Sequence, residues 1–164
     1  MIQIYNDKFK QEVIDLILHV QNVEYGINLS IKEQPDILDI DNNYINSGGC
    51  FWIATNEFNK VIGCIGLQLR ENNVSVLKKF FVYDKYRGKE YNIGLSLYEN
   101  LLKFAKEKNI SKIILDTPSV AKRSHSFYKK VGFKEISKQD LPIKYDYPDR
   151  DSLLFLLNIY YPFN

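Results

Sequence analysis

The segment 74–109 constrains the fold of this chain most, because its hydrophobic pattern changes period within a short distance. Its first part, Val74–Val82, is a run of β-branched and aromatic residues that Lys78 and Lys79 interrupt. Such a run is typical of a buried strand. The two adjacent lysines break the alternation of a regular strand, so the sequence predicts a β-bulge at this point.

The second part of the segment has apolar residues at helical spacing, which predicts a helix from about 92 to 109. Between strand and helix, Gly88 and Gly94 permit a sharp turn and a close approach of the backbone to a ligand. The first amides of a helix have no partner within it and lie at the positive end of its dipole, which favours a pyrophosphate group. The predicted phosphate-binding residues are Lys89, Glu90, Tyr91, Asn92, Ile93, Gly94 and Leu95.

Two blocks of this sequence resemble motifs of the GNAT family of acetyl-CoA-dependent N-acetyltransferases. YRGKEYNIGLSLYENLLKFAKEKN resembles motif A of the family, and AKRSHSFYKKVGF resembles motif B. The motif A signature is Gln or Arg, two residues, Gly, one residue, then Gly or Ala. The three signature positions fall here on Lys89, Asn92 and Gly94. Lys89 and Asn92 differ from the residues of the signature, and Gly94 matches it. Lys retains a hydrogen-bond donor, and Asn accommodates a positive φ better than most residues.

The resemblance covers almost the whole chain, is weakest before Cys50, and implies a fold and a co-substrate. The expected fold is a single α/β domain over residues 1–164, with a mixed, mostly antiparallel sheet flanked by helices. In the family, the two parallel strands splay apart and the pantetheine arm of acetyl-CoA lies between them. Unpaired amides and carbonyls on the facing strand edges can bind that arm, so main-chain contacts are expected from Phe81 and Val82.

Motif B places the general-acid tyrosine of the family at Tyr128. A phenol can protonate the leaving thiolate or donate a hydrogen bond to it. The chain has 12 tyrosines, most of which must be structural, so packing is the competing interpretation of Tyr128. Two family features are missing. Ala121 stands where the family commonly has Asn, and Val74–Val82 contains no carboxylate to act as a base. Deprotonation of the amine is therefore expected through ordered water or through Glu33 or Asp36.

The segment 24–46 carries Glu24, Glu33, Asp36, Asp39 and Asp41 against Lys32 alone. This asymmetry favours a cationic acceptor, and we expect Glu33 and Asp36 to be exposed at a turn around Pro35. A solvated acidic helix face explains any single carboxylate as well. A second aromatic and acidic loop, which contributes either to the acceptor pocket or to ordinary loop structure, contains Tyr145, Asp146, Tyr147, Asp149 and Asp151.

Composition excludes several other classes of function. The 164 residues, 45% of them hydrophobic, suit one domain with a sizeable core. A net charge of only +2 is too balanced for a protein that holds nucleic acid on a broad basic surface. The chain contains no apolar run of membrane-spanning length, so we expect no membrane partner and a cytoplasmic location. Cys50 and Cys64 have no metal-ligand spacing, which predicts buried, reduced thiols and no metal.

The leading hypothesis is an N-acetyltransferase that moves an acetyl group from acetyl-CoA to a primary amine of a small molecule or peptide by direct attack. One alternative is a non-catalytic acyl-CoA-binding sensor. Another is acetylation of the N-terminus of a partner protein. The sequence does not identify the acceptor, and it leaves a homodimer open.

Overall fold

The computed structural model describes residues 1–148 and 151–162. Its strands are β1 (Ile2–Ile4), β2 (Cys50–Thr55), β3 (Val61–Leu69), β4 (Val74–Val82), β5 (Lys112–Pro118), β6 (Lys134–Ile136) and β7 (Ser152–Asn158). The α-helices are α1 (Lys10–Leu18), α2 (Ile93–Glu107) and α3 (Lys122–Lys130). The short helical turns are η1 (Asp7–Phe9), η2 (His19–Glu24), η3 (Ile31–Glu33), η4 (Pro35–Leu38), η5 (Asp41–Ile45), η6 (Asp84–Tyr86) and η7 (Lys138–Asp140).

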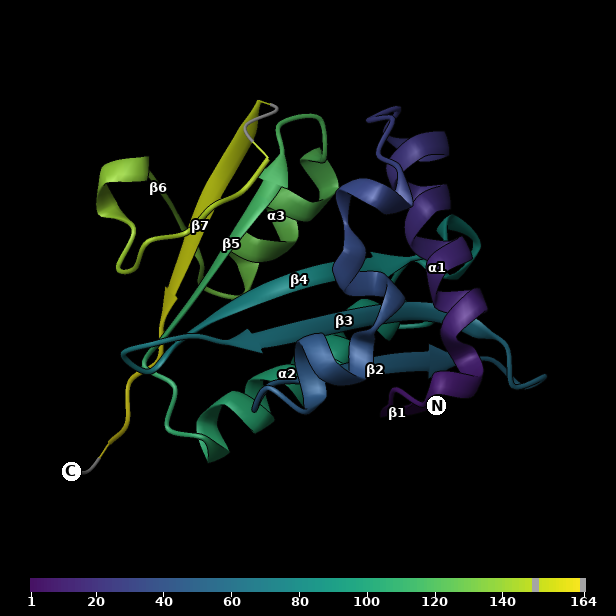
Figure 1. Ribbon diagram of the computed structural model, residues 1–164, viewed down its shortest axis with the longest axis horizontal. Coiled ribbons are helices and arrows are strands. Elements are labelled where there is room, and N and C mark those ends of the chain that lie inside the picture. The colour runs from purple at the N-terminus through teal and green to yellow at the C-terminus, as the bar shows by residue number, and fades with distance from the viewer. Residues whose placement is uncertain (149–150, 163–164) are drawn as a thin grey trace.

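The strands form one seven-stranded sheet in the order β1-β2-β3-β4-β5-β7-β6. Pairing is antiparallel except between β4 and β5, which run parallel because α2 connects them. Their ladder covers only Val74–Val76 against Lys112–Ile114. Beyond these residues the two strands diverge, as Figure 1 shows. The expected single α/β domain with a splayed parallel pair is confirmed.

A β-bulge interrupts β4 where the two lysines lie. The register of β3 against β4 shifts between Cys64 and Gly66, and Lys79 has a φ of 56°. This left-handed conformation is costly for a residue with a Cβ. The predicted bulge is therefore confirmed, and it changes which side chains point to each face of the sheet.

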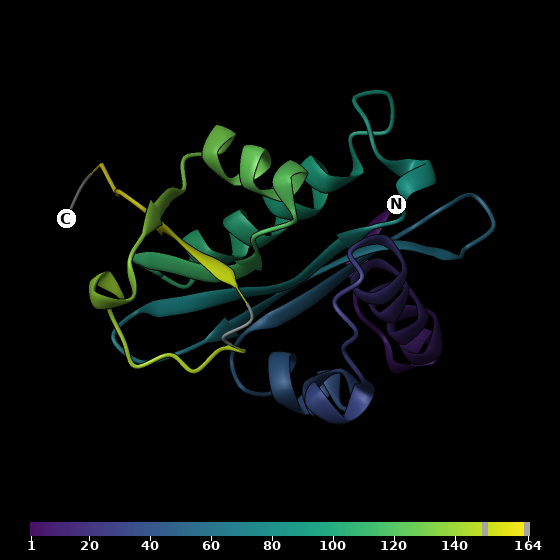
Figure 2. The ribbon, with the colours of Figure 1, turned by 90° about the horizontal axis from the view of Figure 1, so that it is seen from above.

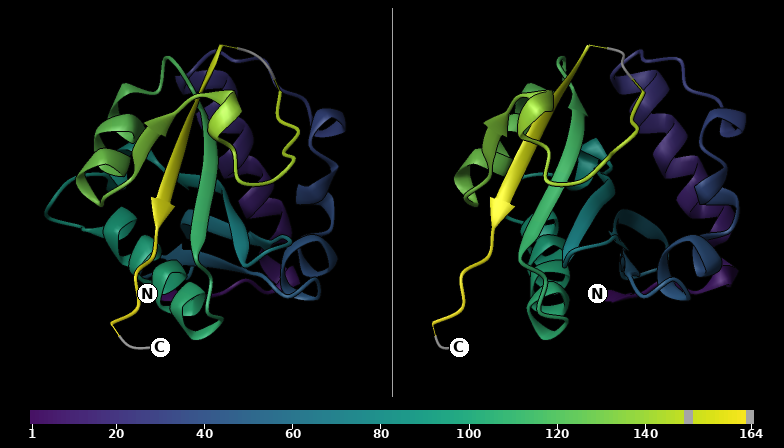
Figure 3. Two further views of the ribbon diagram at one scale, coloured as in Figure 1. Left: turned by 90° about the vertical axis from the view of Figure 1, so that its left-hand side faces the viewer. Right: turned by 60° about the vertical axis from the view of Figure 1, so that its left-hand side comes forward.

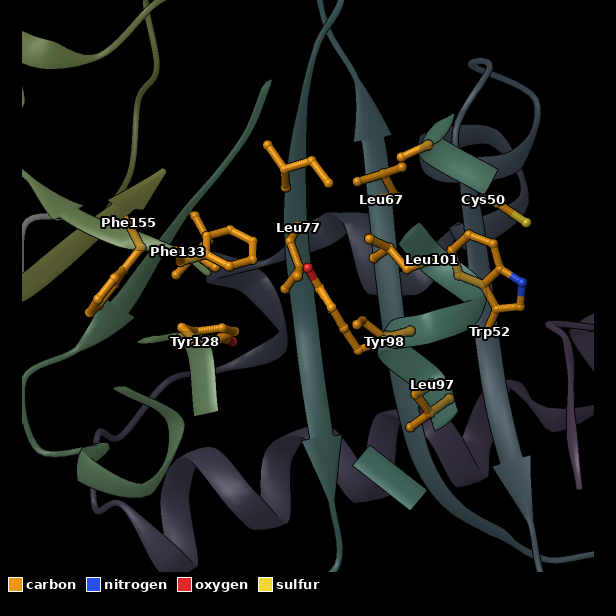
Figure 4. Close-up of a cluster of buried hydrophobic side chains, with 14 of the residues drawn as sticks. Cys50, Trp52, Leu67, Leu77, Leu97, Tyr98, Leu101, Tyr128, Phe133 and Phe155 are labelled. Carbon is orange, nitrogen blue, oxygen red and sulfur yellow. The ribbon is translucent and has the colours of Figure 1, made fainter. Parts of the chain in front are cut away.

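Helices cover both faces of the sheet, as the view in Figure 2 shows. On one face, α2 and α3 bury a core with Trp52, Leu97 and Tyr128 (Figure 4). On the other face, α1 and the turns that follow it bury a second core around Ile17 and Tyr44. A third, smaller cluster lies under the loop before β7.

The segment between α1 and β2, all of which the structure describes, contains the short helical turns η2 to η5 and no longer helix or strand. Helix α1 continues as a π-helical turn, η2, and such turns occur frequently at functional sites. Figure 3 shows this segment and the loop before β7 on the same side of the sheet, on either side of the opening between β4 and β5. The fold therefore places two irregular segments beside the widest part of the splay.

Candidate active site

Two cavities meet at the opening between β4 and β5. The acceptor-side cavity, of about 600 Å³, lies beside the segment after α1 and the loop before β7. The cradle-side cavity, of about 320 Å³, extends to the start of α2. Both are lined by Tyr25, Phe80, Phe81, Ser124 and Tyr128. A ligand that enters along the cradle-side cavity can therefore place its end beside Tyr128, within reach of a second ligand.

The turn before α2 has the conformation that the glycine and asparagine residues predict. Gly88 has a φ of 115° and Asn92, at the start of the helix, a φ of 55°. The amides of Tyr91 and Asn92 both donate to the Gly88 carbonyl, at 3.3 and 3.0 Å. Within the described residues, the next amides along the helix have no acceptor, and these belong to Ile93, Gly94 and Leu95. The helix start therefore offers anion donors in the cradle-side cavity.

The structure brings most of the predicted phosphate-binding residues to this cavity. Its lining includes Lys89, Asn92, Ile93, Gly94 and Leu95. Glu90 and Tyr91 are exceptions, because both lie at the exposed turn outside the lining. The Tyr91 ring packs against Tyr86, at 5.7 Å between ring centroids. Their predicted contact with the pyrophosphate stays a prediction.

Basic side chains surround the same cavity. Arg87 and Arg123 line it together with Lys89 and Lys130. Arg87 is mostly buried and lies 2.6 Å from a carboxylate oxygen of Glu24 in η2. This ion pair joins the segment after α1 to the turn before α2. The position of the Arg87 side chain therefore depends on η2 as well as on its own loop.

The free edge of β4 supports the expected binding of an amide-containing arm. Phe81 and Val82 pair with β3 on one side, and both line the cradle-side cavity. On the other side β4 has no ladder partner beyond Val76 among the described residues. Backbone groups on that edge can therefore bind a ligand that lies in the splay.

Tyr128 projects from α3 into the point where the cavities meet. Figure 4 shows it beside Phe133 and Phe155, whose ring centroids lie 5.6 and 5.9 Å from that of Tyr128. The side chain is only 5% exposed. Burial raises the pKa of the Tyr128 phenol, and the nearby Tyr25 and Asp116 raise it further. At neutral pH the hydroxyl is consequently protonated and able to donate a hydrogen bond.

Glu33 and Asp36 both line the acceptor-side cavity, but they differ in exposure. Glu33 is exposed and accepts a hydrogen bond from the Ser30 amide at 2.9 Å. The side chain of Asp36 is only 15% exposed, so its expected exposure is wrong. Asp36 accepts a hydrogen bond from the Tyr44 hydroxyl at 2.6 Å and lies 4.0 Å from the Lys79 ammonium. Tertiary packing of η4 against η5 and β4 buries it.

Asp116 is a carboxylate of the site that the sequence analysis missed. It lies on β5 just beyond the last residue that pairs with β4, and it lines the acceptor-side cavity. Ile114, two residues earlier, packs with Tyr145, and the Tyr145 hydroxyl donates a hydrogen bond to Asp116. The signal in the sequence was a charged residue within the apolar strand KIILDT, because such residues are rarely buried without a role or a partner.

The loop before β7 lines the acceptor-side cavity, and its role in binding an acceptor stays a prediction. The cavity lining includes Tyr145, Asp146 and Asp151, whereas Asp149 lies outside the described residues. Asp151 accepts a hydrogen bond from Ser119 at 2.6 Å. The cavity is thus enclosed by segments that are far apart in sequence.

Residues 1–148 and 151–162 contain no group of three His, Cys, Asp or Glu side chains that could hold a metal ion. None of the helices in this part of the chain combines the length and the apolar character needed to cross a membrane. Cys50 and Cys64 are both buried and free, as predicted.

Several known proteins are similar to this chain. A crystal structure of an acetyltransferase from Streptococcus agalactiae shares 41% identity and a TM-score of 0.92, covering 97% of this chain and 98% of that one. A Bacillus anthracis protein solved in complex with acetyl coenzyme A shares 25% identity and a TM-score of 0.54, covering 68% of this chain and 62% of that one. N-acetylaspartate synthetase from Xenopus tropicalis is 36% identical over 111 residues, which are 66% of this chain and 40% of the relative.

The chain therefore spans about two-fifths of the length of this curated relative. A family model described as the acetyltransferase (GNAT) family matches residues 14–133 and thus most of the chain, including both motif-like blocks up to Phe133. On this match and the fold, the chain belongs to the GNAT family of acetyltransferases.

Proposed function

We propose that this chain is an N-acetyltransferase that moves an acetyl group from acetyl-CoA to a primary amine of a small molecule or peptide. The main support for this proposal is that the acceptor-side and cradle-side cavities meet at Tyr128, where β4 and β5 diverge. One cavity has the donors for a pyrophosphate, and the other has carboxylates for an ammonium group. Direct attack needs both reactants side by side, and no enzyme nucleophile is required.

In this proposal the cradle-side cavity holds acetyl-CoA, which supplies the acetyl group as a thioester. The amides of Ile93, Gly94 and Leu95 bind the pyrophosphate at the helix start. Phe81 and Val82 bind the pantetheine arm through the free edge of β4. Tyr128 lies at the end of this path, where the sulfur atom would be.

We expect Gly94→Val to lower the affinity for acetyl-CoA at least about tenfold, because the added side chain would occupy part of the cradle. A Cβ at Gly94 would meet only Phe80 Cζ, at 3.7 Å, which is an ordinary contact. The variant should therefore fold. Calorimetric titration with acetyl-CoA measures the effect.

Ser96→Val is the matched control, because Ser96 lies in the first turn of α2 but outside the cavity lining. It should bind acetyl-CoA like the parent. Unchanged affinity in a folded Gly94→Val protein would contradict this placement of the pyrophosphate.

The amine must lose a proton before it attacks, and Asp116 is the proposed proton acceptor. Asp116 and Tyr128 line the same cavity, and the Asp116 charge contributes to the raised pKa of the Tyr128 phenol. The Tyr145 hydroxyl orients the Asp116 carboxylate while leaving it further lone pairs. An ammonium group docked on Asp116 can transfer one proton there and then attack the thioester carbon through its free nitrogen lone pair. The nitrogen loses a second proton as the amide forms, and the departing thiolate takes up this proton to leave as the thiol.

Tyr128 acts on the opposite side of the reaction. As the carbon–sulfur bond breaks, negative charge develops on sulfur, and the Tyr128 hydroxyl donates a hydrogen bond to it. Because burial raises the pKa of this phenol, hydrogen-bond donation is its main contribution, ahead of complete proton transfer. A neutral donor in a buried site stabilises the thiolate strongly, since water does not compete.

The size of the acceptor-side cavity favours a small amine over the N-terminus of a partner protein. A volume of about 600 Å³ lies within the range of small-molecule sites. The similarity to N-acetylaspartate synthetase supports an amino-acid-like acceptor. We propose that the amine arrives as an ammonium ion and that Glu33, at the exposed end of the cavity, attracts it.

We expect Glu33→Gln to lower kcat/KM for cationic amines about threefold at low ionic strength, because one attracting charge is lost. The deficit should shrink at high ionic strength, since salt screens an exposed charge. Asp36→Asn should produce a deficit that persists in salt, because Asp36 is mostly buried beside Lys79. Steady-state kinetics over a series of salt concentrations distinguishes the screened deficit of Glu33→Gln from the persistent deficit of Asp36→Asn.

Glu57→Gln provides the control, since Glu57 is an exposed carboxylate in the β2–β3 turn and lines neither cavity. Its salt dependence should equal that of the parent. If both Glu33→Gln and Asp36→Asn match the parent at low salt, the acidic segment has no role in attracting the acceptor.

Release of thiol from acetyl-CoA in the presence of a panel of primary amines tests the proposed function as a whole. Amine-dependent release and a matching N-acetylated product are expected. Tight binding of acetyl-CoA without release for any amine would instead favour the acyl-CoA-binding sensor.

A further inference from the structure

We propose that Lys79 binds a carboxylate of the acceptor, so that the preferred acceptors are amino acids or amino-acid-like amines. This inference deepens the proposed function and rests on it. It is carried by the position of one lysine, whose ammonium group is held inside the acceptor-side cavity by other parts of the chain.

The β-bulge places Lys79 in the cavity. In a regular strand Lys79 would share a face with Leu77 and point into the core under α2 and α3. Here Phe80 takes that place and packs against Phe127 and Tyr128. Lys79 points to the opposite face, where its ammonium donates a hydrogen bond to Gln34 at 2.7 Å. The costly φ of 56° is consistent with selection for this direction.

A buried polar arrangement fixes the ammonium group. Gln34 and Gln21 exchange two hydrogen bonds, at 2.7 and 3.0 Å, and each is 5% exposed. The Gln34 side-chain oxygen that accepts from Lys79 is thus held in place by η2. Asp36, held by Tyr44, lies 4.0 Å from the ammonium, which is an ion pair but too long for a hydrogen bond.

The ammonium group retains capacity for a ligand. It has three donors, and the hydrogen bond to Gln34 uses one of them. Asp36 compensates the charge only at a distance, and burial lowers the pKa of Lys79. Lys79 lines the acceptor-side cavity, so a ligand carboxylate can reach the two remaining N–H donors of its ammonium group. Hydrogen bonds to this carboxylate would replace those to water that the ammonium group lost on burial.

Opposite charges lie on the two walls of this cavity. Lys79 belongs to β4, and Asp116 belongs to β5 across the splay. Both residues line the acceptor-side cavity together with Tyr128, and the Asp116 charge partly opposes the lowering of the Lys79 pKa by burial. An amino acid can therefore place its ammonium group at Asp116, beside Tyr128, with its carboxylate at Lys79. A simple polyamine can satisfy only the first of these contacts.

The test compares glycine and each standard L-amino acid that has a primary amine with its α-carboxamide, which keeps the amine and removes the carboxylate. The parent should prefer the best amino acid over its amide by roughly 10-fold to 100-fold in kcat/KM, as expected for a charge-assisted hydrogen bond. In Lys79→Met this preference should fall to near one. A parent that favours the amides, or an undiminished preference in Lys79→Met, would overturn the proposal.

Lys78→Met is the matched control, since Lys78 is the neighbouring lysine and lines the same cavity. It should retain the preference, whereas equal effects of both substitutions would reduce the role of Lys79 to net charge. The double variant Lys79→Met with Asp36→Asn removes the ion pair without leaving a buried charge alone. If Lys79 serves only to neutralise Asp36, this variant retains the preference for the amino acid, and the proposal fails.

Direct binding separates this proposal from the proposed function. Thermal shifts of the acetyl-CoA-saturated protein with each amino acid and its amide report recognition whether or not turnover occurs. Turnover without discrimination between acid and amide would reject the role of Lys79 and retain the acetyltransferase. Discrimination in binding without turnover would retain the carboxylate site and reject the acetyltransferase.

Discussion

Tyr128→Phe is expected to lower kcat about 100-fold while the affinity for acetyl-CoA stays unchanged, because the substitution removes only the hydroxyl donor. The aromatic ring remains and keeps its packing against Phe133 and Phe155. Pre-steady-state measurement of thiol release at saturating amine isolates the chemical step. Titration with acetyl-CoA checks binding separately.

Tyr98→Phe is the control for this experiment. Tyr98 lies in the same core cluster, and burial raises its pKa to about 12, but it lines neither cavity. Its hydroxyl has no hydrogen-bond partner within the described residues, so its removal should leave turnover unchanged. An unaffected chemical step in Tyr128→Phe would make Tyr128 a packing residue and end the analogy with motif B.

Asp116→Asn is expected to lower kcat/KM about 100-fold near neutral pH, because an amide cannot accept the proton of the docked ammonium group. The remaining activity should come from acceptor molecules that are already deprotonated. At pH values below the pKa of the acceptor amine, this remaining activity should therefore increase about tenfold for each unit by which the pH is raised. A pH series with one amine measures both the loss and the slope.

Asp146→Asn is the matched comparison, since Asp146 lines the same cavity but is exposed to solvent. It should lose little activity, and its pH profile should follow the parent. If Asp116→Asn loses activity equally at every pH, Asp116 orients the acceptor but does not accept its proton.

Local patterns predicted much of the fold and part of the site. The strand over Val74–Val82 has the predicted bounds, and the helix after it begins one residue from the predicted start. Asn92 adopts the positive φ that its side chain tolerates. These features depend on neighbours in sequence, because side-chain period and backbone preference act over a few residues. The amides of the helix start follow from the same local rules.

Other parts of the site could not be predicted in this way. Deprotonation was predicted through ordered water or through Glu33 or Asp36, and Asp116 on β5 was not among the predicted residues. Its proximity to Tyr128 depends on how far β4 and β5 diverge and on the loop that brings Tyr145 over β5. Asp36 was expected to be exposed, yet packing against Tyr44 and Lys79 buries it.

The sequence by itself determined the strand, the bulge, the turn and the helix beside the cradle-side cavity, because each is set by residues close together in the chain. Only the tertiary structure decided how the side chains that line the acceptor-side cavity are brought together. The bulge turns the Lys79 side chain toward this cavity, and a hydrogen bond to Gln34, from a distant segment of the chain, fixes the position of its ammonium group. Asp116 acquires a place opposite it because two strands that pair at one end separate at the other. Contacts between distant segments are set by packing and strand pairing, which hydrophobic periodicity alone does not encode.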